Sequence, residues 1–229
     1  MINRRDFFNK SMAGLSVLGL SSLACQNGSS DKQAMTKGGR IRITDVDADF
    51  EREPLIRPFG FKGGYMTEIW QTIARMSSGS GHHSIGLCTQ NVLWSDSAVF
   101  ASHSESGGNA LMYALSERAL QMAKGQSFDS PVDLLDAVLE EVYKHGKEIT
   151  DNPDLRKTFA LNALVGFDNA AWLLYAKEHG ITDFDALIPE TYKPALSHHH
   201  EKVASIPLMA YSIPISEIRD AADRGLLFS

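Results

Sequence analysis

The sequence is poor in cysteine, in long apolar runs and in positive charge. Its 229 residues contain two cysteines, Cys25 and Cys88, which are too few for a disulfide framework. It has no run of 18 or more apolar residues, so no membrane-spanning helix is expected in the mature chain. The formal net charge is −6. An acidic chain argues against nucleic acid, or an anionic membrane surface, as a partner held by bulk electrostatics.

Apolar residues are present in an ordinary proportion, 43%, which suffices for one or two domains with a sizeable core. The charge is distributed unevenly along the chain. The first 24 residues carry Arg4, Arg5 and Lys10 against Asp6, a net charge of +2. Subtracting +2 from −6 leaves −8 for the remainder, so the body of the protein is more acidic than the whole.

Residues 1–24 have the layout of an export signal and are set apart from the fold. Arg4 and Arg5 stand in a charged head, ahead of an apolar run from Met12 to Leu23. The arginine pair resembles the twin-arginine signal, which is read by a receptor and exports proteins that have already folded. The alternative is a general secretory signal in which the arginine pair is incidental.

Cys25 follows this signal and opens a polar tether, residues 25–39. The arrangement resembles a bacterial lipoprotein signal, in which the cysteine is lipidated and becomes the first mature residue. Ser22 stands where that signal prefers leucine, and simple cleavage near Ala24 is the alternative. We therefore expect an exported protein that is either periplasmic or anchored to a membrane through a lipid on Cys25.

The next part of the chain predicts strands. Ile41 and Ile43 alternate with polar residues, a period of two that is typical of a strand with one buried face. Two further apolar segments flank a short Ser/Gly-rich stretch and predict an antiparallel hairpin. The three predicted strands are 39–51, 67–75 and 83–90. Two glycine-rich stretches, 57–65 and 102–109, are expected to be loops.

Three helical stretches follow, at 110–124, from Ser130-Pro131 to His145, and from Asn152-Pro153 to Gly180. Strands followed by helices predict an α+β domain at 40–204, with a three-stranded antiparallel sheet packed on a helical bundle. Residues 205–229 differ, because an apolar strand at 206–215 and an amphipathic helix at 216–224 form the unit that builds parallel sheets and barrels.

The stretch FALNALVGFDNAAWLLYAKEHGI, residues 159–181, carries a family resemblance. It resembles the last helical part of the capping domain in the mandelate racemase and muconate lactonising branch of the enolase superfamily. The matching residues are Asp168, Ala170, Trp172 and Leu174, whereas Leu173 stands where the family often has aspartate.

The C-terminal residues extend the resemblance. IPLMAYS, residues 206–212, is similar to the first strand of that family's barrel, and residues 223–228 are similar to the approach to its second strand. The resemblance thus implies a capping domain at 40–204, followed at 205–229 by the first βα unit of an incomplete TIM barrel.

The resemblance also implies a chemistry. In the family, the second barrel strand ends in Lys-x-Lys, whose second lysine removes a proton alpha to a carboxylate. Later strands supply acidic ligands for Mg²⁺, which stabilises the enediolate. This chain ends at Ser229, before those positions. We therefore expect a truncated fragment of a Mg²⁺-dependent racemase, epimerase or dehydratase of small carboxylates, inactive as given. A non-catalytic exported lipoprotein that binds a partner is the alternative.

Five residues are candidates for contact with substrate. In the resembled family the first loop of the capping domain closes over the active site, and Phe59, Phe61 and Lys62 lie in the corresponding region. Ser104 and Asn109 belong to the second glycine-rich stretch, which is a candidate second loop. Ordinary solvent-exposed surface loops are the alternative for both stretches.

Two other patterns are explained better by structural roles than by a metal-binding site. His198 and Glu201 could supply two metal ligands, fewer than a zinc site normally takes from protein. The acids between Asp45 and Asp49 resemble the start of an EF-hand loop, but Phe50 stands where that loop needs glycine. No catalytic or metal-binding residue is therefore assigned.

Two further residues, Asp168 and Cys88, are expected to have structural roles. Asp168 lies within the predicted long helix, where a packing or capping role is expected rather than that of a catalytic acid. Cys88 lies in a predicted strand and is expected to behave as a small hydrophobe.

Overall fold

The computed structural model describes residues 40–198, 200–203 and 213–224. The predictions made for Arg4, Arg5, Cys25, the polar tether and the apolar segment 206–212 lie outside these residues. Among the described residues, no helix is long and apolar enough to cross a membrane.

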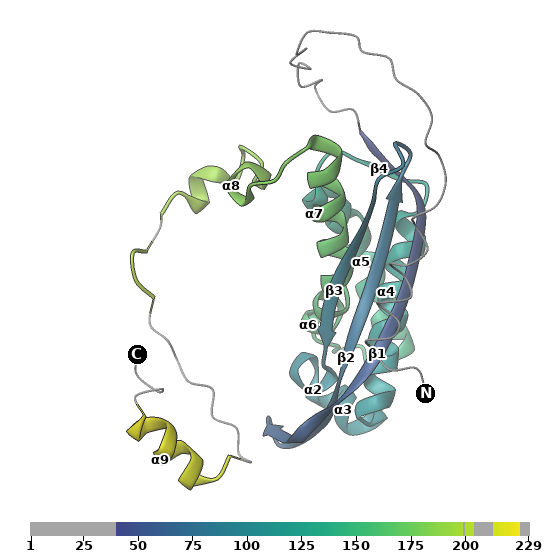
Figure 1. Cartoon of the computed structure of the whole chain (residues 1–229). Coiled ribbons are helices and arrows are strands. Elements are labelled where there is room, and N and C mark those ends of the chain that lie inside the picture. Colours follow the sequence, from purple (N-terminus) through teal and green to yellow (C-terminus); the bar gives the residue numbers. More distant parts are fainter. Residues whose placement is uncertain (1–39, 199, 204–212, 225–229) are drawn as a thin grey trace, which may run out of the picture. The chain divides into compact units, whose positions relative to one another are not determined.

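The fold is α+β, as predicted, and its sheet is antiparallel, with the strand order β3-β2-β1-β4 (Figure 1). The strands are β1 Ile41–Phe61, β2 Gly64–Ser78, β3 His83–Gln90 and β4 Ser127–Phe128. β3 has the predicted bounds, 83–90. β4 pairs its two residues with Ile41 and Arg42, and so short a strand has no sequence period by which it could be predicted.

The prediction of a loop at 57–65 is wrong. β1 and β2 continue through this stretch as a hairpin arm, which a two-residue turn, Lys62-Gly63, closes between the paired residues Phe61 and Gly64. Three glycines and Pro58 give the segment the composition of a loop, but pairing with β2 holds its backbone extended. Between the pairs Pro54–Glu68 and Phe59–Met66, four residues of β1 (55–58) face one residue of β2, so the arm carries a wide bulge.

The three long helices predicted after residue 110 are present, with corrections at their ends, whereas the short helices within 92–103 and 184–187 were not predicted. The α-helices of the described residues are α2 Val92–Ser95, α3 Ser97–His103, α4 Glu105–Ala123, α5 Pro131–Ile149, α6 Lys157–Ala163, α7 Val165–His179, α8 Phe184–Leu187 and α9 Ile215–Asp223. The loop predicted at 102–109 is wrong, because these residues are the end of α3, the N-cap Ser104 and the first turns of α4. The helix predicted from Asn152-Pro153 begins at Lys157 and is interrupted at Leu164.

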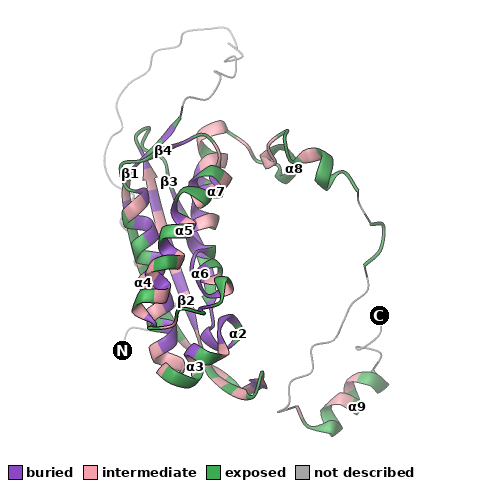
Figure 2. Ribbon diagram, turned by 180° about the vertical axis from the view of Figure 1, so that it is seen from behind, coloured by how far each residue is buried: buried purple, intermediate pink, exposed green. Residues whose placement is uncertain are grey.

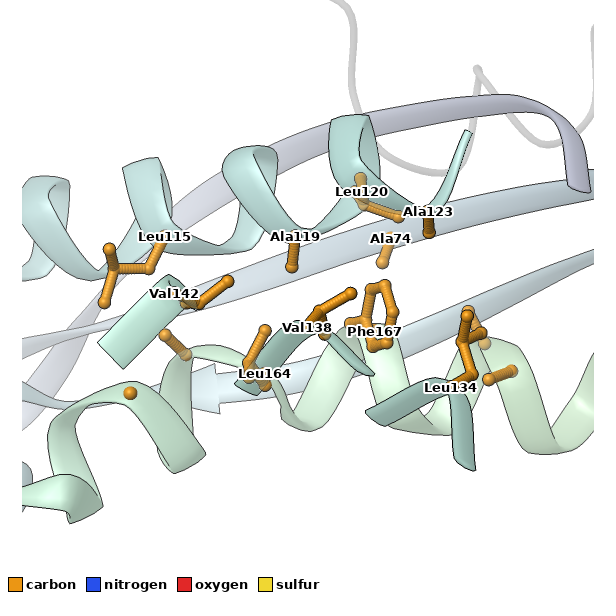
Figure 3. Close-up of a cluster of buried hydrophobic side chains, with 14 of the residues drawn as sticks. Ala74, Leu115, Ala119, Leu120, Ala123, Leu134, Val138, Val142, Leu164 and Phe167 are labelled. Atoms are coloured by element: carbon orange, nitrogen blue, oxygen red, sulfur yellow. The ribbon is translucent and has the colours of Figure 1, made fainter. Parts of the chain in front are cut away.

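The long helices cover one face of the sheet and enclose the core. Figure 2 shows α4, α5, α6 and α7 over this face, and Figure 3 shows side chains from α4 and α5 meeting Phe167 and Leu164. Gly86 of β3 approaches Gly166 of α7 very closely, since a Cβ on Gly86 would lie 2.0 Å from the Gly166 carbonyl oxygen. Alanines at positions 74, 119, 163, 170 and 171 are also buried, so small side chains bring helices and sheet close together.

The free edge of β3 is covered by polar side chains. Lys177 Nζ donates to the carbonyl of His83 at 2.6 Å, and Asn169 Nδ2 donates to the carbonyl of Leu87 at 2.9 Å. Asn162 Nδ2 donates to the carbonyl of Thr89 at 3.4 Å. An uncovered edge strand can pair with another chain, and these three donors occupy three of the carbonyl acceptors that such pairing would use.

Candidate functional site

The end of the β1–β2 arm has a strained turn. Lys62 and Gly63 both have positive φ, +49° and +79°, as a two-residue type I′ turn requires. Asn-Gly is the usual choice, and a lysine in this conformation is unfavourable by itself. Because Lys62 and Gly63 form the turn that closes the hairpin, the Lys62 side chain lies at its extreme end.

Lys62 reaches back from the turn to α2. Its Nζ donates to the carbonyl oxygen of Trp94 at 2.6 Å and lies 5.9 Å from the centroid of the Trp94 ring and 5.8 Å from that of Phe61. Trp94 is 52% exposed. The turn and α2 thus form one surface, which we call the tip cluster: Phe59, Phe61, Lys62 and Trp94.

Aromatic rings surround the ammonium group. The rings of Phe59 and Phe61 meet edge to face, 5.8 Å apart, and both side chains are partly exposed. Behind them Gly64 lies against α2 and α3, because a Cβ there would stand 3.0 Å from Phe100 and 3.1 Å from Leu93. The tip cluster therefore combines one cation with apolar walls, an arrangement suited to an anionic group attached to an apolar or planar body.

A polar network anchors the arm at its base. Both carboxylate oxygens of Glu68 accept hydrogen bonds from Arg52, and Oε1 also accepts from Trp70 Nε1 and Ser106 Oγ. Burial acts to raise the pKa of Glu68, but these hydrogen bonds outweigh it, so that its pKa lies below the usual value. Glu105, in the first turn of α4, accepts from the backbone and hydroxyl of Thr67. The arm is thus tied to the N-terminus of α4.

Ser104 and Asn109 do not lie in a loop, although both act near the tip cluster. Ser104 is the N-cap of α4, with φ +67° and its Oγ accepting from the backbone N–H of Gly107 at 3.2 Å. Asn109 is fully buried, and its Oδ1 accepts from the backbone N–H of Val92 at 2.9 Å. Asn109 therefore positions α2, which carries Trp94, and is not itself exposed to a ligand.

Trp94 is the residue that sequence reasoning missed. The signal that could have found it is the segment NVLWSD after β3, in which Asn91 and Asp96 each precede a run of helix-forming residues. Asn91 Oδ1 accepts from the backbone N–H of Trp94 at 2.8 Å and so caps α2. Asp96 caps α3 through the backbone N–H groups of Ala98 and Val99.

The remaining candidates have structural surroundings. Burial raises the pKa of Asp168 despite a hydrogen bond with Trp172, and burial raises the pKa of the Cys88 thiol. Asp45 pairs with Arg75 at 2.8 Å and Lys124 at 3.2 Å. Within residues 40–198, 200–203 and 213–224, no group of three His, Cys, Asp or Glu side chains is placed to hold a metal ion. These residues therefore do not fit a Mg²⁺ site.

Solved structures with a similar fold include L-talarate dehydratase from Polaromonas sp. JS666, complexed with Mg and L-glucarate, at 18% identity and a TM-score of 0.48. A mandelate racemase/muconate lactonizing enzyme from the same organism is similar at 19% identity and a TM-score of 0.48. Each match covers 81% of this chain, and 43% and 41% of the respective solved chains.

The dipeptide epimerase of Enterococcus faecalis V583, complexed with Mg and L-Leu-L-Tyr, is similar at 15% identity and a TM-score of 0.37, over 60% of this chain and 32% of that one. This chain thus spans less than half the length of these proteins. No protein-family model and no curated protein sequence matches the chain.

Proposed function

We propose that this chain is the capping element of an enolase-superfamily protein of the mandelate racemase and muconate lactonising branch. The activity of the whole protein would be removal of a proton alpha to the carboxylate of a small acid. Two observations support this function: the order and spacing of Asp168, Ala170, Trp172 and Leu174, and an α+β fold in which an anchored hairpin arm presents a cationic tip.

The contact between Lys62 and Trp94 carries the proposal. An ammonium group has three N–H donors, and the Trp94 carbonyl takes one, which leaves two for an anionic oxygen. The Trp94 and Phe61 rings stand beside it and would exclude water from a bound acid. Lys62 would hold the substrate through its carboxylate or another anionic oxygen, while the rings would contact its carbon skeleton.

The described residues are assigned binding and water exclusion, and no proton transfer. Mg²⁺, when bound in proteins of this superfamily, supplies Lewis-acid stabilisation of the enediolate. Because the described residues do not fit such a site, we derive no step through the metal. We propose that this chain alone turns over no substrate.

The binding role can be tested by fluorescence titration of the exported, processed chain with mandelate and with glucarate. We expect a saturable change in tryptophan emission, which Trp94→Phe removes and Lys62→Met weakens by at least tenfold in affinity. Lys193→Met, an exposed lysine on the connecting segment, is the control and should bind like the wild type. Saturable binding that Lys62→Met leaves unchanged would contradict the assignment.

A non-catalytic binding module is the second candidate, favoured by the lack of a metal-binding group among the described residues. Incubation of the chain with Mg²⁺ and each acid in D₂O tests whether the chain by itself removes the alpha proton. Neither candidate function requires that it does. We expect no incorporation of deuterium at the alpha carbon. Incorporation that exceeds the buffer control would show that this chain carries the chemistry.

A further inference from the structure

The three cations between residues 51 and 65 of the hairpin differ in their partners. Arg52 donates to both carboxylate oxygens of Glu68. Arg57 donates to both carboxylate oxygens of Glu217, at 2.9 and 2.8 Å. Lys62 instead contacts a backbone carbonyl and two aromatic rings, and among the described residues no Asp or Glu side chain forms an ion pair with it. Of these three cations, Lys62 is therefore the one available to an anionic ligand.

The charge of the chain disfavours a dianion at this site. The net charge is −6, or −8 without the first 24 residues. A negatively charged protein repels a ligand in proportion to the ligand's own charge, so a second carboxylate on the ligand doubles the repulsion. Lys62 can pair with one of two carboxylates, whereas Arg52 and Arg57 are already paired. The tip cluster therefore favours a ligand with a single anionic group.

The walls beside the ammonium group are mainly apolar. The rings of Trp94 and Phe61 lie 5.9 and 5.8 Å from Lys62 Nζ, and Phe59 meets Phe61 edge to face. Ligand hydroxyl groups that are buried against phenyl rings lose their hydrogen bonds to water and gain none in exchange, which lowers affinity. An aromatic ring buried in the same place loses no hydrogen bonds and gains ring contacts.

The Trp94 ring is held in place before a ligand binds. Asn91 accepts from the backbone N–H of Trp94 at 2.8 Å, and Asn109 accepts from that of Val92 at 2.9 Å, so α2 is fixed by two side chains. Trp94 is nevertheless half-exposed. An ordered ring that is open to solvent can stack with the planar part of a ligand at a small cost in entropy.

We propose that the tip cluster selects aryl-substituted monocarboxylic acids, such as mandelate, against polyhydroxylated dicarboxylic acids, such as glucarate. The inference rests on the proposed function, because it assumes that Lys62 holds the carboxylate of the substrate. The carboxylate accepts from Lys62, and the aryl ring stacks on Trp94. Lys62 thus supplies affinity for the anion, and Trp94 determines specificity.

The two contributions can be separated by experiment. Lys62 donates to the backbone carbonyl of Trp94 and not to its side chain, and Asn91 caps α2 through the backbone N–H of the same residue. Replacement of the Trp94 side chain therefore leaves in place both the contact that holds Lys62 and the cap that holds α2.

Isothermal titration calorimetry of the exported, processed chain with mandelate and with glucarate tests this proposal. We expect mandelate to bind at least about tenfold more tightly. Trp94→Leu should weaken mandelate binding by about tenfold and leave glucarate binding within about twofold, whereas Trp94→Phe, which keeps a ring, should retain the preference. Phe184→Leu changes an exposed aromatic side chain of α8 and is the control, which should bind both acids like the wild type.

A second comparison needs no variant. Hexahydromandelate has the charge of mandelate and a saturated ring, and it should bind the wild type at least about threefold more weakly than mandelate. Equal affinities for mandelate and glucarate, or for mandelate and hexahydromandelate, would overturn the selectivity. If Lys62→Met still weakened that binding, the proposed function would stand. Absence of binding, or binding that Lys62→Met leaves unchanged, would overturn the proposed function and the selectivity with it.

Discussion

Gly86 of β3 and Gly166 of α7 face each other so closely that neither backbone leaves room for a side chain at position 86. A Cβ on Gly86 would lie 2.0 Å from the carbonyl oxygen of Gly166 and 2.3 Å from the backbone nitrogen of Ala170. Both atoms belong to the backbone of a helix and cannot rotate away as a flexible side chain can. The distance between α7 and the sheet therefore depends on this glycine.

Gly86→Ala should destabilise the protein by about 3 kcal/mol or more, because α7 must move as a body to admit the methyl group. The free energy of unfolding, obtained from urea denaturation followed by circular dichroism, measures the effect. Gly79→Ala is the matched control, since its nearest neighbour, Thr44 Cγ2, would be 3.7 Å away. A difference below about 0.5 kcal/mol between the two variants would contradict the contact.

Asn109→Ala should cost about 1–3 kcal/mol, because it leaves the buried backbone N–H of Val92 without an acceptor. The same variant should release α2, so the emission of Trp94 should move toward that of a solvent-exposed tryptophan. Asn152→Ala removes an exposed amide that accepts from the backbone N–H of Asp154 and serves as the control. Emission unchanged in Asn109→Ala would show that Asn109 does not position α2.

Glu178 should make stability depend on pH. Its Oε1 accepts from Ser78 and Ser80 and lies 3.2 Å from His82 Nδ1, which ties α7 to the β2–β3 turn. Burial acts to raise the pKa of Glu178, but these contacts outweigh it and leave the pKa below its usual value of 4.5. A lowered folded-state pKa contributes stability above pH 4.5, and this contribution is lost as the pH falls through the folded-state value.

Glu178→Gln should therefore lose less stability than the wild type between pH 6 and pH 3.5, while being less stable at pH 6. Urea midpoints at half-unit pH intervals give both quantities. Glu201→Gln, in the connecting segment, should follow the wild-type curve. Parallel curves for Glu178→Gln and the wild type would mean that the carboxylate does not gain these hydrogen bonds on folding.

Export should depend on the arginine pair. Replacing Arg4 and Arg5 with lysine should retain the precursor in the cytoplasm, because the twin-arginine receptor reads arginine, whereas the general secretory route accepts any basic head. Immunoblots of periplasmic and cytoplasmic fractions measure the outcome, with Lys10→Arg as the control. Processed double variant in the periplasm would favour the secretory alternative.

The sequence was sufficient where a pattern is local, as at β3, where a short apolar segment after a Ser/Gly-rich stretch predicts the strand and its bounds. The sequence was misleading where a glycine is needed for two elements to pack closely and not for a turn. Gly108 lies in α4, where a Cβ would stand 2.5 Å from Val92 Cγ2, so the glycine that suggested a loop allows α2 to pack against the helix.

Only part of the candidate site was predicted, because a sequence pattern brings together only residues that are close along the chain. Phe59, Phe61 and Lys62 are close in sequence and were found together. Trp94 joins them through a contact between residues 32 positions apart, which no local pattern reveals. Pro58, in the glycine-rich stretch that was predicted as a loop, lies within the bulge, where a strand tolerates it.

The wide bulge in β1 separates the register of the arm from that of the body of the sheet. The β1–β2 pairs up to Pro54–Glu68 belong to the body of the sheet, and the core sets their register. The pairs from Phe59–Met66 onward belong to the arm, and the turn sets theirs. Residues added or removed at 55–58 would leave every core pair of the sheet in place. The arm can therefore change length at its bulge, during evolution or by design, without shifting the core, and its end would then meet α2 at another position than the present contact between Lys62 and Trp94.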